Sequence, residues 1–388
     1  MRVLGLISGT SHDGIDCALV DFAHHGGVLS AVIEETRTVP YSGRLRSQLM
    51  AALPPAEVSL GAVTELDTWI GQEFSGAASA VLSGHQAELI CSHGQTVYHW
   101  VDQGTVRGSL QLGCPAWIAE RTGVPVLSDV RSRDIAAGGQ GAPLVPVLDH
   151  LLLGGEAGPS AALNLGGIAN VTVLHDGGDP VAYDVGPANA LIDAAVRMTG
   201  AHPDGYDQGG ELAAAGTVDQ ALLRELLAEP YYAARVPKST GKELFNEAYV
   251  QGFLARSGVS MRPEDLMATL TELTVRTVVD ALGTAAVKKV VASGGGTVNP
   301  VIMEGIRRGL PGVRVVSSEH YGVPAEAKEA LAFALIGWLS WHGLPAALSS
   351  ATGARQSRIL GTLSPGAEPL RLPQPLTAMP SALRVESV

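Results

Sequence analysis

Apolar runs separated by short glycine turns are the most regular pattern along this chain. Residues 3–7 and 15–20 are two such runs on either side of a small-residue turn, and residues 161–165 and 171–174 repeat the arrangement at mid-chain. A further run, residues 289–292, ends at a glycine triad. Short apolar runs bounded by turn residues predict buried β-strands. Their repetition predicts two halves built on one plan.

Helices are predicted between these strands, where apolar residues recur every three to four positions. In residues 58–82 the recurring positions are Val63, Leu66, Ile70 and Phe74, and this spacing places them on one helical face. Further helices are predicted at about residues 188–200, 208–228, 243–256, 263–286, 300–308 and 325–342.

Alternating strands and helices predict an α/β protein, and a chain of 388 residues can hold two domains. We expect an N-terminal domain at residues 1–135 and a C-terminal domain at 136–350. Residues 351–388 are expected to return to the N-terminal domain and to end in a loose tail, because the last stretch carries several prolines and little periodicity.

Composition excludes several classes of function. Hydrophobic residues make up 46% of the chain and charged residues 16%, so a large core is available. The net charge of −12 disfavours nonspecific nucleic-acid binding, which depends on Lys and Arg. The three widely spaced cysteines predict neither a disulfide framework nor a zinc site. No signal peptide or membrane-spanning apolar stretch is visible, so we expect a cytoplasmic protein with no membrane or nucleic-acid partner.

The first turn has the chemistry of a phosphate site. Gly9, Thr10 and Ser11 bring backbone N–H groups and hydroxyls to one point, which suits a phosphate. Asp13 and Asp16 add carboxylates that could hold Mg²⁺ directly or through its waters. An ordinary glycine-rich hairpin uses the same residue types, and this turn alone leaves that alternative open.

Two common nucleotide motifs are absent. Gly241 and Lys242 are followed by Glu243 instead of Ser or Thr, so the P-loop pattern fails. The triad at 294–296 lacks the last glycine of the dinucleotide-binding pattern, because position 299 is Asn. The order of the three glycine turns resembles instead the two-domain actin-like fold of sugar kinases and heat-shock ATPases, with ATP bound in the interdomain cleft.

That layout assigns ten residues to ATP. The terminal phosphates are assigned to Gly9, Thr10 and Ser11 with Asp13 near Mg²⁺, and, from the second domain, to Gly166 and Gly167. The α-phosphate or ribose is assigned to Gly294, Gly295 and Gly296, and the base to Asn299. The alternative is that these glycines only satisfy turns.

An ordered set of motifs resembles one family, the anhydro-N-acetylmuramic acid kinases of bacterial cell-wall recycling, over roughly residues 3–363. The motifs are SGTSHDG at 8–14, SHGQT at 92–96, DVRSRDIAAGGQGAP at 129–143, LNLGGIAN at 163–170, DVGP at 184–187, PKSTGKE at 237–243 and EALAFA at 329–334. Each motif alone is weak, but the ordered set is specific.

The resemblance implies a kinase that uses ATP and Mg²⁺, acts on a small-molecule sugar and forms a homodimer. The family's reaction hydrolyses the 1,6-anhydro bridge of 1,6-anhydro-N-acetylmuramic acid and phosphorylates O6. The resemblance also implies that Asp184 is the catalytic residue. A carboxylate at the end of a strand can serve as a general base. The alternative for Asp184 is a cap on the helix that starts near Asn189.

Five residues are candidates for sugar binding: His93, Gln95, Thr96, Arg131 and Glu329. Arg131 could grip the lactyl carboxylate, or form a salt bridge with Asp129 or Asp134 instead. His93 could equally be a satisfied packing residue, and Glu329, suggested by the resemblance, could be a surface residue. Lys238 and Lys242 could be loop contacts or solvated charges.

The chain departs from the family pattern at three positions. Cys114 stands where the family usually has an acidic residue, Gly209 replaces the second acid of a common pair, and Ala188 replaces a common glycine. We expect these changes to affect substrate preference and rate. Two rival functions stay open: an actin-like kinase of another sugar, and a nucleotide-dependent sugar-binding regulator without turnover.

Overall fold

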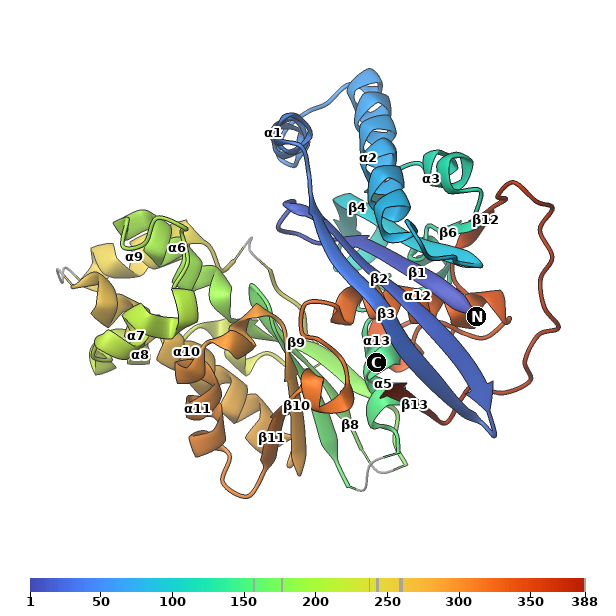
Figure 1. Cartoon of the computed structure of the whole chain (residues 1–388). Coiled ribbons are helices and arrows are strands. Elements are labelled where there is room, and N and C mark those ends of the chain that lie inside the picture. The colour runs from blue at the N-terminus through green and yellow to red at the C-terminus, as the bar shows by residue number, and fades with distance from the viewer. Residues whose placement is uncertain (156–157, 176, 237, 242–243, 258–260, 387–388) are drawn as a thin grey trace. The chain divides into compact units, whose positions relative to one another are not determined.

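A computed structural model of the chain describes residues 1–155, 158–175, 177–236, 238–241, 244–257 and 261–386. The chain forms two compact units, coloured by residue number in Figure 1. Unit 1 comprises residues 1–155, 321–323 and 327–388, and unit 2 comprises residues 156–320 and 324–326.

Unit 1 is built on a mixed sheet in the order β12-β6-β4-β1-β2-β3-β13, with β5 paired to β4 outside this path. The strands are β1 (Arg2–Ser8), β2 (Gly14–His25), β3 (Val28–Pro40), β4 (Leu89–Asp102), β5 (Thr105–Leu112), β6 (Val126–Ser128), β12 (Thr362–Ser364) and β13 (Ala382–Glu386). The strands β1, β2 and β3 form an antiparallel meander, and β4 runs parallel to both β1 and β6. The strands predicted at 3–7 and 15–20 are confirmed.

Helices cover both faces of this sheet. They are α1 (Gly43–Ala52), α2 (Leu60–Val81), α3 (Pro115–Thr122), α4 (Ser132–Ala136), α5 (Pro146–Leu153), α12 (Lys328–Trp341) and α13 (Ser349–Thr352). Side chains alternate along β1, so Val3 and Ile7 share a core with α12, whereas Leu4 and Leu6 share a core with α2. Figure 1 shows α2 and α12 on opposite sides of the strands.

Glycines stand where the helix α12 contacts the sheet. A Cβ at Gly5 would collide with the backbone of Ala330 and Ala334, and one at Gly337 would lie 2.8 Å from Cβ of Cys91. Side chains at these two positions would push helix and sheet apart. The close contact fixes the first turn of α12, which carries Lys328 and Glu329.

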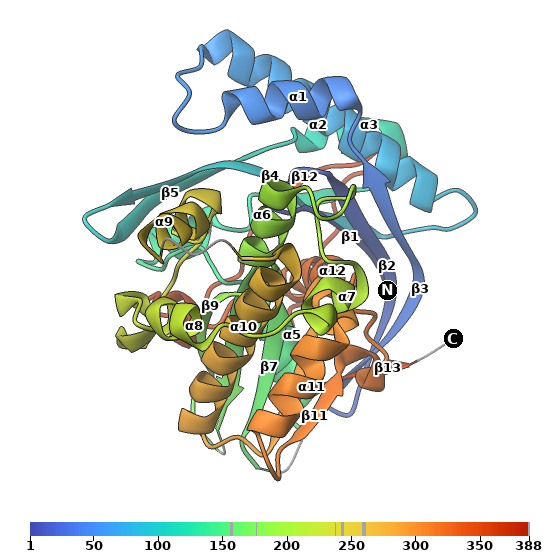
Figure 2. The same ribbon diagram turned by 90° about the vertical axis from the view of Figure 1, so that its left-hand side faces the viewer.

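Unit 2 contains a five-stranded sheet in the order β11-β10-β7-β8-β9. Its strands are β7 (Ser160–Leu165), β8 (Ile168–Leu174), β9 (Val181–Pro187), β10 (Lys289–Ser293) and β11 (Arg314–Ser317). Its helices are α6 (Asn189–Thr199), α7 (Glu211–Ala215), α8 (Gln220–Leu227), α9 (Glu247–Ser257), α10 (Pro263–Thr284) and α11 (Pro300–Gly309). Residues from β7, β8, β10, α6, α10 and α11 share one apolar core, and Figure 2 shows α10 and α11 over the strands.

The two sheets repeat one strand order. In unit 2, β7, β8 and β9 form an antiparallel meander, and β10 runs parallel to both β7 and β11. This is the arrangement of β1, β2, β3, β4 and β6 in unit 1. The repeat confirms the prediction of two α/β halves built on one plan, and it agrees with the duplicated fold that the resemblance implies.

The helices α5 and α12 belong to unit 1, although the sequence boundaries placed residues 136–350 in the second domain. Their apolar residues, such as Leu148 and Phe333, complete the core under the first sheet. The burial of α5 and α12 against the first sheet therefore places them in unit 1, and no local sequence pattern indicates this packing.

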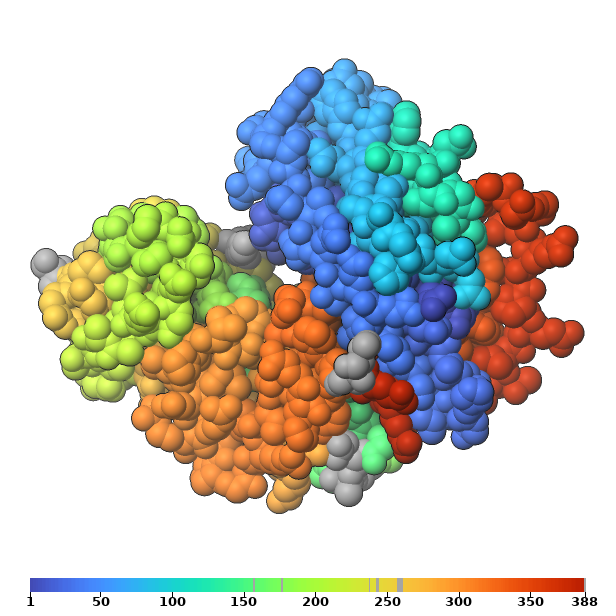
Figure 3. All heavy atoms as spheres, in the orientation of Figure 1, coloured from blue at the N-terminus to red at the C-terminus, as the bar shows by residue number. Residues whose placement is uncertain are grey.

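The C-terminal segment is more ordered than the expected loose tail. β12 pairs with β6, and β13 pairs in parallel with β3. Figure 3 shows the red C-terminal residues lying on the blue surface of unit 1. Leu383 is buried in the core of that unit, and this burial fixes the last strand.

One predicted helix is wrong in its length. The segment 208–228 is interrupted, because Gly209 and Gly210 have positive φ and α7 ends before Gly216. No helix in the described part of the chain is long and apolar enough to cross a membrane.

Candidate functional site

The side chain of Gln95 forms hydrogen bonds that support the turn between β1 and β2. The Gln95 side chain is fully buried; its Oε1 lies 2.7 Å from the Ser8 hydroxyl, and its Nε2 donates to the Gly9 carbonyl at 3.2 Å. Gln95 was predicted to bind the sugar, but these bonds engage both ends of its amide in supporting the turn. Thr10 and Ser11 remain exposed at the top of the turn.

Two carboxylates follow the turn. Asp13 is exposed and accepts a hydrogen bond from the Ser11 hydroxyl at 2.6 Å. Asp16 accepts from Thr38 at 2.6 Å, and desolvation raises its pKa, with a smaller contribution from Asp13. The oxygen donors of Asp13 and Ser11 fit a cation such as Mg²⁺ that keeps most of its waters. The described residues contain no group of three or more His, Cys, Asp or Glu side chains placed to hold a metal.

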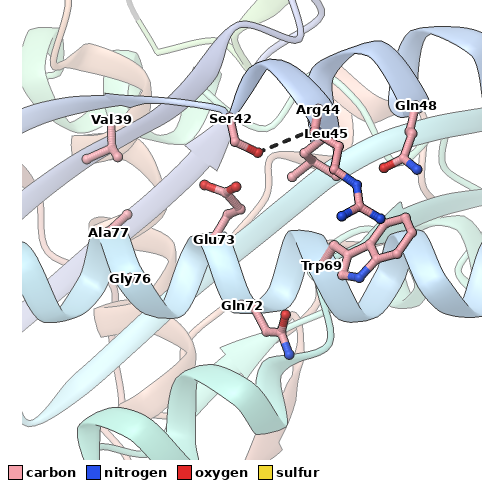
Figure 4. A pocket seen from close by; sticks show the side chains of 10 residues that line it. All are labelled: Val39, Ser42, Arg44, Leu45, Gln48, Trp69, Gln72, Glu73, Gly76 and Ala77. Atoms are coloured by element: carbon pink, nitrogen blue, oxygen red, sulfur yellow. Dashed lines mark hydrogen bonds between the residues drawn. The ribbon is translucent and has the colours of Figure 1, made fainter.

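A pocket of about 360 Å³ lies between α1 and α2 (Figure 4). Arg44 lies over the Trp69 ring at 5.2 Å, and Glu73 and Gln48 also line the pocket. The helix α1 contacts the turn directly, because Arg46 Nε donates to the His12 carbonyl. The pocket lining contains none of the residues predicted to bind ATP or the sugar.

Arg131 follows β6 and is fixed by two hydrogen bonds. Its Nε donates to Nε2 of His93 at 2.9 Å, and its Nη1 donates to the Gly141 carbonyl at 2.6 Å. Desolvation lowers the pKa of Arg131 to about 10, and the charges of Glu329 and Asp134 oppose this shift. Arg131 therefore remains a cation.

The two alternative salt-bridge partners of Arg131 are engaged elsewhere. Asp134 accepts hydrogen bonds from the Gly141 backbone at 2.8 Å and from the Thr352 hydroxyl at 2.7 Å. Asp129 accepts from the Ser132 hydroxyl at 2.6 Å. Asp134 thus shapes the loop whose carbonyl holds Arg131, and the two residues interact through charge and through that loop.

Glu329 stands in the first turn of α12 and reaches solvent. Protein nevertheless surrounds it closely enough that desolvation raises its pKa, with Asp16 adding to the shift and Arg131 opposing it. The charges of Asp16 and Arg131 both act on the pKa of Glu329, and the residue itself is exposed, as the surface alternative predicted. The Thr96 hydroxyl, another predicted sugar contact, accepts a hydrogen bond from Gln111 Nε2 at 3.0 Å.

In unit 2 the Gly166–Gly167 turn is tied to the start of α6. The Gly166 carbonyl accepts from the Asn189 N–H at 3.0 Å, and the Gly167 carbonyl accepts from Ala188 and Ala190. These bonds satisfy N–H groups that open the helix. The turn and the helix are therefore one rigid unit.

The glycine triad after β10 packs against the same turn. A Cβ at Gly294 would lie 2.5 Å from Oδ1 of Asn164, and one at Gly296 would lie 2.7 Å from Cβ of Leu165. At Gly295 the nearest atom would be Nδ2 of Asn189, 4.0 Å away. Two of these glycines are thus required by packing, and Gly295 is the one that leaves room for a ligand.

Asn299 is the N-cap of α11. Its Oδ1 accepts from the backbone N–H groups of Val301 and Ile302, and the residue is 5% exposed. A Cβ at Gly210 would collide with its amide. The capping bonds give the Asn299 side chain a structural role. Its predicted position near the base therefore rests only on the order of the glycine turns in the sequence.

Asp184 lies on β9 and is held by three backbone contacts. Its carboxylate Oδ2 accepts from the Thr240 N–H at 3.0 Å, and its own N–H donates to the Lys238 carbonyl at 3.0 Å. Its carbonyl accepts from the Tyr231 hydroxyl at 2.7 Å. The N-cap of α6 is Ala188, so Asp184 is not the helix cap that the alternative required.

Lys238 supports this arrangement rather than extending into solvent. Its Nζ donates to the carbonyls of Tyr231 and Tyr232 at 3.0 and 2.9 Å and lies 4.6 Å from the Tyr231 ring centroid. Desolvation lowers its pKa. Lys242, the other predicted loop contact, lies outside the described residues. Sequence reasoning missed Tyr231 and Thr240, although Thr240 lies in the PKSTGKE motif.

The three departures from the family pattern have separate structural settings. Cys114 is the N-cap of α3, and Ala188 is buried at the start of α6. Gly209 has φ of 60°, and a Cβ added there would have no other atom within 4 Å. Asp207, the acid that remains, accepts from the N–H groups of Leu212 and Ala213 at the start of α7.

The family model and the curated relatives that match this chain over nearly its full length give the same name. The family model described as anhydro-N-acetylmuramic acid kinase matches residues 1–366. A protein of that name from Streptomyces coelicolor is 52% identical over 388 residues, covering 99% of both chains. One from Rhodococcus erythropolis is 50% identical over 398 residues, covering 100% of both.

Two solved structures are distant matches. A ROK family glucokinase from Streptomyces griseus in complex with glucose and AMPPNP has a TM-score of 0.38 at 14% identity, covering 86% of this chain and 98% of that one. The activator of the 2-hydroxyisocaproyl-CoA dehydratase from Clostridium difficile has a TM-score of 0.42 at 12% identity, covering 87% of this chain and 94% of that one. Scores this low support no inference about this chain.

Proposed function

Because the chain belongs to the anhydro-N-acetylmuramic acid kinase family, we propose that it hydrolyses the anhydro bridge of 1,6-anhydro-N-acetylmuramic acid and phosphorylates O6. The products are N-acetylmuramic acid 6-phosphate and ADP, and the role is cell-wall recycling. The observation that carries the proposal is Asp184, whose carboxylate is held by the Thr240 N–H and whose backbone is held on both sides. A fixed carboxylate is what a general base requires.

The proposed chemistry couples two bond changes. Asp184 takes a proton from water, and the water oxygen bonds to the anomeric carbon. The bond from that carbon to O6 breaks, and O6 bonds to the γ-phosphorus as the bridging oxygen leaves with ADP. Asp184 later returns its proton to solvent. Attack opposite the departing O6 predicts inversion at the anomeric carbon.

The remaining roles are assigned by chemistry. Gly9, Thr10 and Ser11 bind the terminal phosphates, with Gly166, Gly167 and Gly295 contributing backbone surface. Arg131 binds the lactyl carboxylate as a charge-assisted pair, and Glu329 contacts the sugar or the water. Mg²⁺, when bound near Asp13, neutralises phosphate charge. We also propose a cytoplasmic homodimer.

An ADP-release assay across sugars tests the proposal. We expect ADP release with 1,6-anhydro-N-acetylmuramic acid and a 6-phosphorylated product, and little with N-acetylglucosamine. Asp184→Asn should lose turnover, whereas Asp280→Asn, which removes the same charge from an exposed position of α10, should not. Turnover of a simple sugar instead would favour the rival kinase, and ligand binding without ADP release would favour the regulator.

A further inference from the structure

Both ring nitrogens of His93 are engaged within unit 1. Nε2 lies 2.9 Å from Nε of Arg131, and Nδ1 lies 2.9 Å from the carbonyl oxygen of Gly94. The arginine Nε carries a hydrogen, so the histidine Nε2 must accept it. Nδ1 then carries the single ring proton and donates it to Gly94. This neutral tautomer leaves no ring nitrogen for a ligand.

The His93 ring is also closed to solvent. The residue is 3% exposed, and its ring centroid lies 4.7 Å from that of Phe333 on α12. Desolvation and the charge of Arg131 lower the pKa of His93 well below its usual value. The imidazole therefore stays neutral and keeps its acceptor for Arg131.

The bonds to Arg131 fix the direction of its guanidinium. His93 holds Nε, and the Gly141 carbonyl holds Nη1, while Asp134 fixes the Gly141 loop. The third nitrogen, Nη2, has two N–H donors. An arginine that is held in place loses less conformational entropy when it binds a carboxylate.

We propose that His93 is a positioning residue that directs Nη2 of Arg131 toward the lactyl carboxylate of the sugar, and that it does not touch the sugar itself. This inference rests on the proposed function, in which Arg131 binds that carboxylate. His93 thereby sets the preference for a sugar that carries an acid over the same anhydro sugar without one.

Two amide substitutions separate this role from packing. In His93→Gln, the amide Oε1 of the new side chain can lie near the former position of Nε2 and accept the hydrogen bond from Arg131 Nε. The shorter His93→Asn side chain reaches only the position of Nδ1. Both variants lose the ring contact with Phe333, so they are matched controls for packing, and thermal unfolding reports any general loss of stability.

The readout is kcat/KM for 1,6-anhydro-N-acetylmuramic acid divided by that for 1,6-anhydro-N-acetylglucosamine, which lacks the lactyl group. His93→Asn should lower this ratio about tenfold, the effect of losing one hydrogen bond to a charged group. His93→Gln should keep most of it. Neither should change KM for ATP, and Arg131→Gln should lower the ratio at least as far as His93→Asn.

The outcomes are distinguishable. If wild type turns over neither sugar, the proposed function fails. If Arg131→Gln lowers the ratio but His93→Asn leaves it unchanged, the inference is overturned while the proposed function stands. An ¹⁵N NMR measurement of His-labelled wild type tests the tautomer without any activity. We expect a neutral ring with the proton on Nδ1 near pH 7, and a proton on Nε2 would overturn the inference.

Discussion

Alanine substitutions in the glycine triad after β10 separate packing from ligand binding. Gly294 has φ of +84°, and a Cβ there would lie 2.5 Å from Asn164 Oδ1 and 2.9 Å from the Leu165 backbone. At Gly295 the nearest atom would be 4.0 Å away. The two positions are adjacent, so each is the matched control for the other.

The two costs at Gly294 add. With φ of 84° and ψ of 167°, Gly294 has a backbone conformation that is essentially limited to glycine and costs another residue about 1–3 kcal/mol. Forcing an extra methyl group into a packed site costs about 1–3 kcal/mol. Gly294→Ala should therefore lower the free energy of unfolding by about 2–6 kcal/mol. Each kcal/mol shifts the melting temperature of a unit this size by about 2–4 °C, so we expect a drop of roughly 4–24 °C. Gly295→Ala should stay within about 0.5 kcal/mol of wild type.

Thermal unfolding and ATP titration of both variants measure these effects. Gly295→Ala should melt like wild type but bind ATP more weakly, because its methyl group enters the backbone surface assigned to the nucleotide. If Gly294→Ala also melts like wild type, the packing argument is refuted. If Gly295→Ala binds ATP normally, the triad serves only as a turn.

Three further perturbations test other parts of the account. Asp184→Asn should keep ATP binding and lose about 10²–10⁴-fold in kcat, because the amide oxygen can still accept from Thr240 but cannot take a proton; near-normal kcat would remove Asp184 from the mechanism. Lys328→Met removes one partner of the buried 2.7 Å ion pair with Asp149 and should cost about 3–5 kcal/mol in chemical denaturation, whereas an unchanged midpoint would show that the pair contributes nothing. Because the pKa of Glu329 is raised in the folded protein, its ionisation opposes folding as pH rises through that pKa. Glu329→Gln should therefore raise the melting temperature at pH 8 but not below the unfolded pKa of about 4.3; an equal rise at both pH values would contradict this.

The strands and turns were predictable because their signals are local. Apolar runs beside glycine turns placed β1, β2, β7, β8 and β10 correctly. The last strand was missed because its stability comes from pairing with β3, more than 350 residues earlier in the chain. The break in the helix predicted at 208–228 did have a local signal, because the segment contains three glycines. The helical spacing of its apolar residues led to the prediction of one continuous helix instead.

The site residues divide in the same way. Residue types identified Asp184 and Arg131 as chemically capable, and the structure shows each of them held by several hydrogen bonds. His93 and Gln95 have the same residue types as ligand-binding side chains. Their burial and bond partners, which no motif reveals, support the proposal that His93 positions Arg131 and show that Gln95 is bonded to the first turn. A motif therefore marks a site without saying which members face the ligand.

The coupling of hydrolysis to phosphorylation is tested most directly by mass spectrometry of the product formed from 1,6-anhydro-N-acetylmuramic acid, ATP and Mg²⁺ in ¹⁸O-water. Attack by water predicts a 6-phosphorylated sugar with one ¹⁸O at the anomeric carbon, analysed before exchange with solvent, and at least about 100-fold slower formation of this product by Asp184→Asn. A phosphorylated product without ¹⁸O at that carbon would contradict attack by water and the role of Asp184 as its base.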